Sequence, residues 1–259
     1  MPPSKPNYSA PALEKGIDIL ELLADQPAGL TQLDIAVHLG RSVSEIFRML
    51  NCLVQRGYVM LNKPGDVYTL TLKMFELSHR HPPMRRLVAE ALPLMTDLTR
   101  ITSQSCHITV IHNDRILVVA QMESPANLGF SVRVGAQLDI LQTASGMVML
   151  AFQSEENRQR MLVAHDQASG TTSDFSQLER HFSRIRRRGY EEADSLQIQG
   201  IKNISFPVLD PAGYAFAAVT VPFLQRLDQE NERRVEETRE ALRKVAVKLS
   251  ATSDLAISA

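Results

Sequence analysis

The stretch from Thr31 to Leu70, TQLDIAVHLGRSVSEIFRMLNCLVQRGYVMLNKPGDVYTL, decides the fold of the first third of this chain. Two capping boxes begin helices within it, at Thr31–Asp34, where Asp replaces the usual Glu, and at Ser42–Glu45. Two short strands, YVMLN and VYTLT, follow and flank the turn Lys63-Pro64-Gly65-Asp66. Capped helices followed by such a hairpin are typical of a winged helix-turn-helix, which offers a helix to the major groove of DNA and a wing to its backbone.

Apolar residues at helical spacing predict which face of each helix is buried. A first helix is expected ahead of the quoted stretch, with Ser9 as its cap and Pro11 in its opening turn. The residues that we expect the three helices to bury are Leu13, Ile17, Leu20 and Ala24, then Leu33, Ile35 and Val37, then Ile46, Leu50, Leu53 and Val54.

The third helix has a polar face opposite its apolar stripe. If Ile46 and Leu50 face the core, the other side presents side chains that hydrogen-bond base edges and phosphates. The residues expected to bind DNA are Arg41, Ser42, Ser44, Arg48, Asn51, Gln55 and Lys63. Arg48 can bind guanine through two hydrogen bonds, whereas Arg41 and Lys63 suit phosphates. The alternative is an ordinary solvated helix face.

The charge of the chain neither favours nor excludes nucleic acid as a partner. The 259 residues carry a net charge of −1, and residues 1–83 contain eight Lys and Arg against eight Asp and Glu, a net of zero. The basic surplus usual in a DNA-binding domain is therefore missing. The basic residues in the third helix and the wing are Arg41, Arg48, Arg56 and Lys63.

Composition is typical of a globular protein of a reducing compartment. Cys52 and Cys106 do not make a disulfide framework. The sequence has no run of 18 apolar residues, and its start, MPPSKPNYSA, lacks the apolar core of a secretory signal. We therefore expect a cytoplasmic protein.

A break at His81-Pro82-Pro83 separates a second domain of a different type. We expect a DNA-binding domain over 9–70, a linker over 71–83 with a helix at Thr71–Arg80, and a second domain over 84–252. Within the second domain, helices are expected over 84–100, 143–152, 174–188 and 228–250, and strands over 105–111, 115–122, 129–134, 204–210 and 214–221. Because strands and helices do not alternate strictly, an antiparallel α+β fold is favoured.

Three features of the second domain have two interpretations each. Cys106-His107 suggests a metal or a nucleophile, but neighbours on a strand point to opposite faces, so a place in a pocket or core is favoured. Ser145-Gly146 at a helix start suits either an anion bound by free N–H groups or close packing. The run RIRRRG suits a nucleic-acid patch, but a solvated helix end is favoured.

Several segments, taken in order, resemble the IclR family of bacterial transcriptional regulators from about Leu13 to Leu249. The matching segments are LEKGIDILELLA, SVSEIFRMLNCLVQRGYV, YTLTLKMFEL, VRVGAQLDILQTASGMVMLA, RRRGYEEADSLQIQGIKNISFPVLD and AAVTVPF. The resemblance implies an N-terminal winged helix and a C-terminal effector-binding domain related to the GAF and profilin folds, with an antiparallel sheet and flanking helices. It also implies that small organic or aromatic acids bind the second domain, and that the protein forms dimers or tetramers.

The resemblance further implies where an effector binds. The family pattern L-P-L-H-A-T-A-L-G-K aligns with Leu138–Met147, and Leu141 replaces the family's His. The first Asp of the family's D-D-E-E segment is lost at Ala193. The implied effector-binding residues are Thr143, Ala144, Ser145, Gly146, Asp194, Asn203 and Thr220. A polyhydroxylated or carbonyl-bearing ligand suits the polar anchors of this set, which are Asn203, Thr220, Ser145 and Asp194.

From these observations we expect a ligand-responsive, sequence-specific DNA-binding regulator, acting as a repressor on a double-stranded operator. Its effector is expected to be a small organic acid or a sugar-acid-like molecule. We expect no cofactor, no metal and no enzymatic activity. Two alternatives stay open: a small-molecule sensor that acts through a protein partner, and an enzyme that uses the C-terminal pocket. The sequence contains no G-x-S-x-G elbow, Walker loop or dinucleotide fingerprint.

Overall fold

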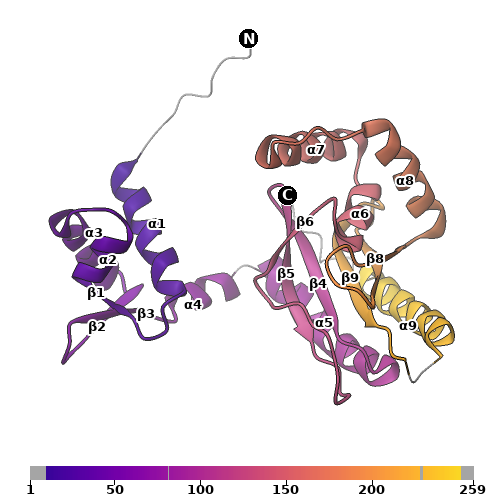
Figure 1. Cartoon of the computed structure of the whole chain (residues 1–259), viewed down its shortest axis with the longest axis horizontal. Helices are drawn as coiled ribbons and strands as arrows, with labels where there is room; N and C mark the ends of the chain where they lie inside the picture. The colour runs from indigo at the N-terminus through magenta and orange to yellow at the C-terminus, as the bar shows by residue number, and fades with distance from the viewer. Residues whose placement is uncertain (1–9, 81, 228–229, 252–259) are drawn as a thin grey trace, which may run out of the picture. The chain divides into compact units, whose positions relative to one another are not determined.

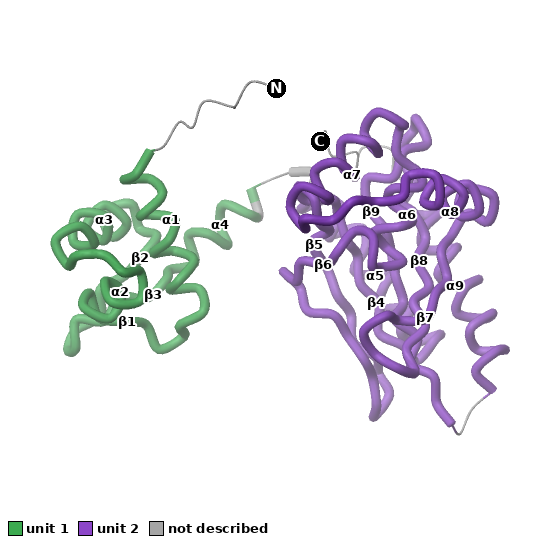
Figure 2. The backbone as a smooth tube through the Cα atoms, turned by 45° about the horizontal axis from the view of Figure 1, so that its top comes forward, with its two compact units in different colours: residues 1–81 green, residues 82–259 purple. Residues whose placement is uncertain are grey.

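The computed structural model describes residues 10–80, 82–227 and 230–251. The chain divides into two compact units, Met1–His81 and Pro82–Ala259, which are called the N-terminal and C-terminal units below (Figures 1 and 2). Among the described helices, none combines the length and the apolar character that a membrane crossing needs.

The N-terminal unit is a winged helix. Its small antiparallel sheet has the strand order β1-β3-β2, and β2 and β3 form the wing. Its elements are α1 (Pro11–Ala24), β1 (Leu30–Thr31), α2 (Gln32–His38), α3 (Val43–Gln55), β2 (Val59–Asn62), β3 (Val67–Leu70) and α4 (Lys73–His79). The fold predicted from the sequence is confirmed, with β1 as an unexpected addition.

Both predicted capping boxes are present. The Thr31 hydroxyl accepts from the N–H of Asp34 at 3.2 Å, and the Asp34 carboxylate accepts from the N–H of Thr31 at 3.2 Å. Ser42 and Glu45 repeat the arrangement at the start of α3, at 3.4 and 3.1 Å. These reciprocal bonds satisfy backbone donors that would otherwise lack partners in the first turn.

The buried faces of α1 and α2 differ from those expected. α1 buries Ile19 and Leu23, and α2 buries Ile35 and Ala36, so the expected burial of Ile35 is confirmed. Four residues expected in the core are exposed: Leu13 by 64%, Ile17 by 45%, Leu33 by 61% and Val37 by 71%. Ala24 is also exposed. Each helix has two candidate apolar stripes, and tertiary packing on α3 chooses between them. Ser9 lies outside the described residues, and Ala10 precedes the first turn of α1.

The C-terminal unit is built on a six-stranded antiparallel sheet with the order β6-β5-β4-β9-β8-β7. Its helices are α5 (Pro82–Thr102), α6 (Ala144–Ala151), α7 (Glu155–Ser169), α8 (Phe175–Arg188) and α9 (Asn231–Ala251). Its strands are β4 (Cys106–His112), β5 (Arg115–Met122), β6 (Gln137–Asp139), β7 (Glu191–Asp194), β8 (Ile201–Leu209) and β9 (Ala215–Leu224). The predicted antiparallel α+β fold is confirmed.

Helices cover both faces of this sheet (Figure 1). α5 and α9 pack on one face, where residues such as Met95, Phe223 and Leu242 form the larger core. α6 packs on the other face, and α8 packs on α6, with Ile140 and Phe182 in a second core. Successive residues of β4, β8 and β9 therefore point alternately into two different environments.

Three parts of the C-terminal unit were not predicted correctly. Residues 129–134 form no strand, and the short β6 follows them instead. Just ahead of β6, the N–H of Gly135, whose φ is +86°, donates to the Val118 carbonyl of β5 at 2.8 Å. α7 and β7 were not expected, because their charged sequences show weak apolar periodicity.

Gly146 allows α6 to pack against the turn before it. A Cβ at this position would lie 2.1 Å from the carbonyl oxygen of Ile140, and that oxygen belongs to the backbone and cannot move aside easily. We predict that Gly146→Ala lowers the free energy of unfolding of the C-terminal unit by about 1–3 kcal/mol, as other overpacked cores do. Urea unfolding followed by circular dichroism measures this change.

Gly16→Ala provides the matched control, because a Cβ on this helical glycine would meet no atom within 4 Å. We expect that substitution to be neutral or to stabilise the N-terminal unit by roughly 0.5–1 kcal/mol. Equal stability of Gly146→Ala and the wild type would show that the contact with Ile140 relaxes at no cost.

Candidate functional site

The exposed face of α3 carries the residues expected to bind DNA. Ile46 and Leu50 are buried on the opposite side of the helix. The residues placed on the exposed surface of α3 or beside it are Arg41, Ser42, Ser44, Arg48, Asn51, Gln55 and, in the turn of the wing, Lys63. The structure therefore gathers the hydrogen-bonding side chains on one accessible helix face, as the sequence predicts.

Glu45 holds α3 in place. Its carboxylate lies 2.6 Å from the Lys15 ammonium of α1, besides its bonds to Ser42. The hydrogen bond from Lys15, followed by those from Ser42, lowers the pKa of Glu45 to about 2. The charge of Glu45 is therefore balanced within the unit, which fits a structural role for this residue.

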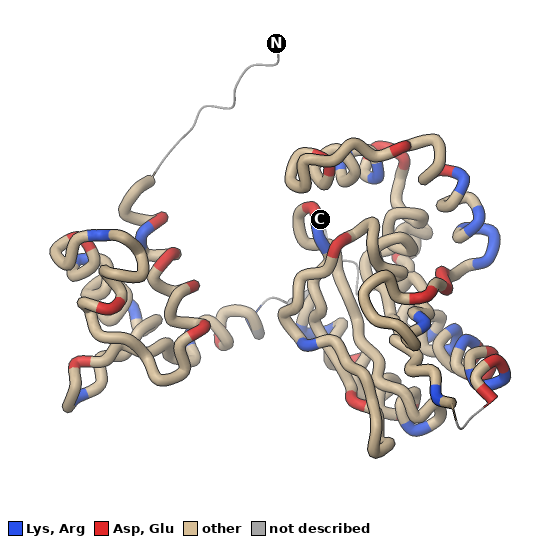
Figure 3. Tube along the Cα trace, viewed as in Figure 1, with Lys and Arg blue, Asp and Glu red and all other residues tan. Residues whose placement is uncertain are grey.

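The basic side chains in and near α3 and the wing differ in whether they form ion pairs. Arg41 lies 4.0 Å from the Asp18 carboxylate. Within the described ranges, Arg48, Arg56 and Lys63 form no ion pair within 4.0 Å. Figure 3 shows basic and acidic residues interspersed along the backbone of this unit.

In the C-terminal unit, Thr143 shapes the turn that leads into α6. Its hydroxyl donates to the carbonyl of Asp139 at 2.7 Å and accepts from the N–H of Gly146 at 3.2 Å. Ala144 and Ser145 are buried in the first turn of α6. Because the Gly146 N–H has a partner and a Cβ at this position would overlap the Ile140 carbonyl, packing accounts for this glycine without a bound anion.

Asn203 and Thr220 share the face of the sheet that α6 covers. Thr220 of β9 pairs with Ser205 of β8, and Asn203 pairs with Pro222, two residues further along β9. Directly paired residues point to the same side of a sheet, so Asn203 and Thr220 are diagonal neighbours. The resemblance identified both positions, and the structure brings them together.

Thr220 belongs to a row of polar side chains, called the polar row below, that crosses five strands and is buried at all its members except the half-buried Gln121. Cross-strand pairing places its members side by side. The members, from β5 to β7, are Gln121, His107, Thr220, Ser205 and Glu191. The hydroxyls of Ser205 and Thr220 lie 2.8 Å apart, and the Glu191 carboxylate lies 2.9 Å from His181 Nε2 of α8. Most residues of the polar row were not predicted from the sequence, because they become neighbours only through the register of the strands.

Two atoms of the polar row are buried without a hydrogen-bond partner. They are Nδ1 of His107 and Nε2 of Gln121. Burial lowers the pKa of His107 to about 4, so its ring is neutral at pH 7. A neutral ring and an amide are groups that would hydrogen-bond hydroxyl or carbonyl groups of a ligand.

Cys106 and His107 do not act together. Cys106 packs in the core under α5, where burial raises the pKa of its thiol to about 12, whereas His107 faces α6. The interpretation that these residues line a core or a pocket is confirmed. In the part of the chain that the structure describes, no group of three His, Cys, Asp or Glu residues is placed to hold a metal ion.

Asp194 is separated from the other implied effector residues. It pairs with Lys202 and so lies on the sheet face opposite Asn203. Its side chain is 80% exposed and lies 3.1 Å from the Lys202 ammonium. It lines an open cavity of about 550 Å³ with the loop 195–200 and Gln225.

The basic run at the end of α8 has structural partners. Arg186 donates to the Ala151 carbonyl at 3.1 Å and contacts Glu179 at 2.5 Å. Arg188 lies over the ring of Tyr190, 5.8 Å from its centroid. These contacts favour the interpretation of this run as a helix end over a nucleic-acid patch.

Comparisons with known proteins agree with this geometry. The helix-turn-helix domain of the IclR family matches residues 12–61, and the family's C-terminal domain, described as bacterial transcriptional regulator IclR C-terminal, matches residues 83–251. The transcriptional regulator KdgR of Escherichia coli is 28% identical over 83% of this chain and 82% of its own length. The glycerol operon regulatory protein of Streptomyces coelicolor is 27% identical over 87% of this chain and 89% of its own length.

Solved structures show the same fold. The IclR protein of Thermotoga maritima superposes with a TM-score of 0.70, at 24% identity over 92% of this chain and 98% of its own. An IclR homologue of Microbacterium hydrocarbonoxydans, solved with 4-hydroxybenzoate, superposes with a TM-score of 0.75, at 22% identity over 95% of this chain and 100% of its own. Since the two family domains together span most of its length, the chain belongs to the IclR family of bacterial transcriptional regulators.

Proposed function

We propose that this protein is a repressor that binds a pseudo-palindromic operator and changes its affinity for DNA when a small acid binds its C-terminal unit. The exposed polar face of α3 is the observation that carries the proposal. α3 enters the major groove, and Arg48, Asn51 and Ser44 contact base edges there. The protein acts in the cytoplasm, where its operator lies.

Phosphate contacts fix the register of α3 on the duplex. Arg41 and Lys63 flank the helix at its start and at the turn of the wing, and Ser42 and Gln55 lie near its two ends. Such contacts hold orientation without selecting sequence, so base recognition depends mainly on Arg48 and its neighbours.

The protein acts as a homodimer or as a tetramer built from two dimers. Exposed apolar residues of α1 and α4 support this part of the proposal, since such patches mark protein–protein contacts. They include Leu13, Ile17, Met74 and Phe75. A two-fold dimer presents two copies of α3 to successive major grooves.

The effector is a small organic acid or a sugar acid. Thr143, Ala144, Ser145 and Gly146 form the turn beside which it binds, and Asn203 and Thr220 contact it from the sheet. The unpartnered atoms of the polar row support a ligand that bears hydroxyl or carbonyl groups. The 4-hydroxybenzoate complex of the Microbacterium homologue supports an acid as the class of ligand. The resemblance predicts that Asp194 also contacts the effector. The sheet register argues against this contact, because it puts Asp194 on the face opposite Asn203.

A second candidate is a sensor that acts through a protein partner and uses its winged helix only for dimerisation. The zero net charge of residues 1–83 favours it. DNA binding that weakens steeply with salt would reject it, because neutralised phosphates release counterions.

Arg48→Ala tests the DNA-reading face. We predict that the wild type selects a palindromic site from genomic fragments, and that Arg48→Ala loses roughly 1–3 kcal/mol of discrimination at one base pair in each half-site. Electrophoretic mobility shifts with the selected site and with that base pair replaced measure the loss. Arg187→Ala, which removes an exposed arginine of α8, is the control and should bind as the wild type does. Unchanged selectivity of Arg48→Ala would reject base recognition by this residue.

Asn203→Ala tests the effector site. We predict that pyruvate, gluconate or 4-hydroxybenzoate raises the thermal unfolding temperature of the wild type, by several degrees when the acid is about 100-fold above its dissociation constant. Asn203→Ala should lose that shift.

Asp194→Ala is the matched control for the opposite sheet face, and it should keep the shift. Loss of the shift in Asp194→Ala alone would place the effector in the open cavity beside Lys202 and would overturn the site at Asn203.

A further inference from the structure

α7 lies outside the sheet (Figure 1). Its buried residues are Arg158, Leu162 and His165. Near its first turn, Arg158 donates to the Gln153 carbonyl at 3.0 Å and pairs with Glu179 at 3.3 Å. Towards its other end, His165 is the buried polar contact. The position of α7 over the α6 turn therefore depends strongly on His165.

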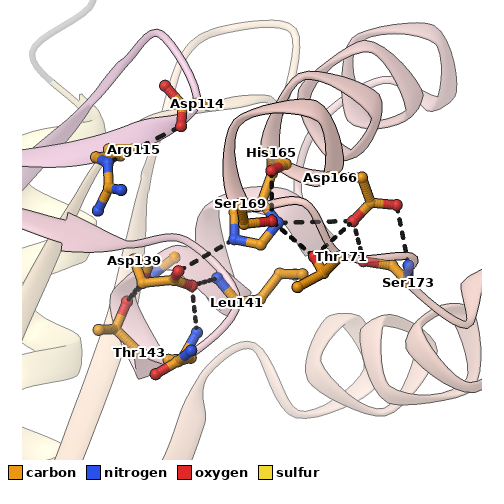
Figure 4. Close-up of polar contacts among 12 residues, drawn as sticks. Asp114, Arg115, Asp139, Leu141, Thr143, His165, Asp166, Ser169, Thr171 and Ser173 are labelled. Atoms are coloured by element: carbon orange, nitrogen blue, oxygen red, sulfur yellow. Dashed lines mark hydrogen bonds and ion pairs between the residues drawn. The ribbon is translucent and has the colours of Figure 1, made fainter.

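His165 bonds directly to the residue that organises the α6 turn (Figure 4). Its Nε2 lies 3.1 Å from Oδ2 of Asp139. The other carboxylate oxygen of Asp139 accepts from the N–H groups of Leu141 at 2.8 Å and Gln142 at 3.0 Å. One carboxylate thus joins α7 to the backbone of the turn.

The chain of hydrogen bonds continues into α6. The carbonyl of Asp139 accepts from the Thr143 hydroxyl at 2.7 Å, and that hydroxyl accepts from the Gly146 N–H at 3.2 Å. Because Gly146 also packs against Ile140 at close range, a small displacement of Asp139 would move the first turn of α6. Hydrogen bonds thereby connect α7 to Thr143 and Gly146.

A second carboxylate faces the other ring nitrogen of His165. Asp166 Oδ1 lies 3.7 Å from Nδ1, and the Asp166 carboxylate is itself fixed by the N–H and the hydroxyl of Ser173, at 2.9 and 2.6 Å (Figure 4). Nδ1 is buried without a hydrogen-bond partner. The charged groups around the ring are Asp139 and Asp166, with Arg115 next to Asp139 in the strand register.

Asp139 is ionised in this arrangement. Burial alone would raise the pKa of Asp139, but hydrogen bonds from His165, Leu141 and Gln142 outweigh it and lower the pKa. An ionised Asp139 can only accept, so Nε2 of His165 carries the proton of this bond.

We propose that His165 is a positioning residue for the effector site: its bond to Asp139 holds α7 against the turn and fixes residues Thr143–Gly146 in the geometry that binds the acid. The inference rests on the proposed function, since it concerns the same site. A hydrogen bond to a charged group is among the stronger ones in proteins, so its loss should loosen the turn measurably.

The test compares His165→Leu, which fills space but cannot donate, with His165→Gln, whose Nε2 amide can donate to Asp139. Hydrogen–deuterium exchange of the full-length protein is measured on peptides that cover residues 139–147, with the β8–β9 hairpin as the internal reference. We expect exchange in 139–147 to be roughly ten- to a hundredfold faster in His165→Leu, and near the wild-type rate in His165→Gln. Equal rates in all three proteins, or equally fast exchange in both variants, would overturn the proposal.

A second measurement uses the wild type alone, so it tests the proposal even if His165→Leu fails to fold. Nitrogen-15 spectra of histidine-labelled protein should show a proton on Nε2 of His165, and an Nε2 without a proton would overturn the proposal. Any acid that raises the unfolding temperature should bind His165→Leu more weakly, and His165→Gln should restore its affinity. If none of the acids binds while the exchange result holds, the proposed effector fails and the positioning contact stands.

Discussion

The reciprocal hydrogen bonds between Ser42 and Glu45 fix where α3 begins, and the rest of the proposed DNA-binding surface depends on that start. Once the first turn is set, helical periodicity places Ile46 and Leu50 in the core and Arg48 outside. The Lys15–Glu45 ion pair then ties this turn to α1. A helix start displaced by one residue would rotate the polar face by about 100° and bury it.

A side-chain cap also begins a helix in the C-terminal unit, but there the cap is connected to other elements. Thr143 caps α6 through the Gly146 N–H, but the cap is built into a turn that Asp139 also holds. The N-terminal caps are solvent-exposed and local, whereas this one is connected through His165 to α7. Hydrogen bonds thus connect the residues implied in effector binding to a peripheral helix.

Residues close together in the chain predicted most helices and strands. Contacts between residues far apart in the chain could not be predicted from the sequence. The capping boxes, the wing and the β8–β9 hairpin follow from residues close together in the chain. The burial of Ile19 in place of Leu13 does not, because α1 has two apolar stripes and packing on α3 selects one. The polar row joins residues from Gln121 to Glu191 through strand register alone. Asp194 was assigned to the effector site from the resemblance. Because side chains alternate between the two faces of a sheet, Asp194 points away from the face that carries Asn203.

In the proposed function, binding of the effector to the C-terminal unit changes the affinity of the same protein for its operator. The most direct measurement is the affinity of the full-length protein for its selected operator with and without a saturating acid, together with the affinity for that acid with and without operator. We expect both affinities to change by the same factor, roughly 5- to 150-fold, because coupling free energies are reciprocal. An operator affinity that does not change with an acid bound at Asn203 would contradict the proposed function.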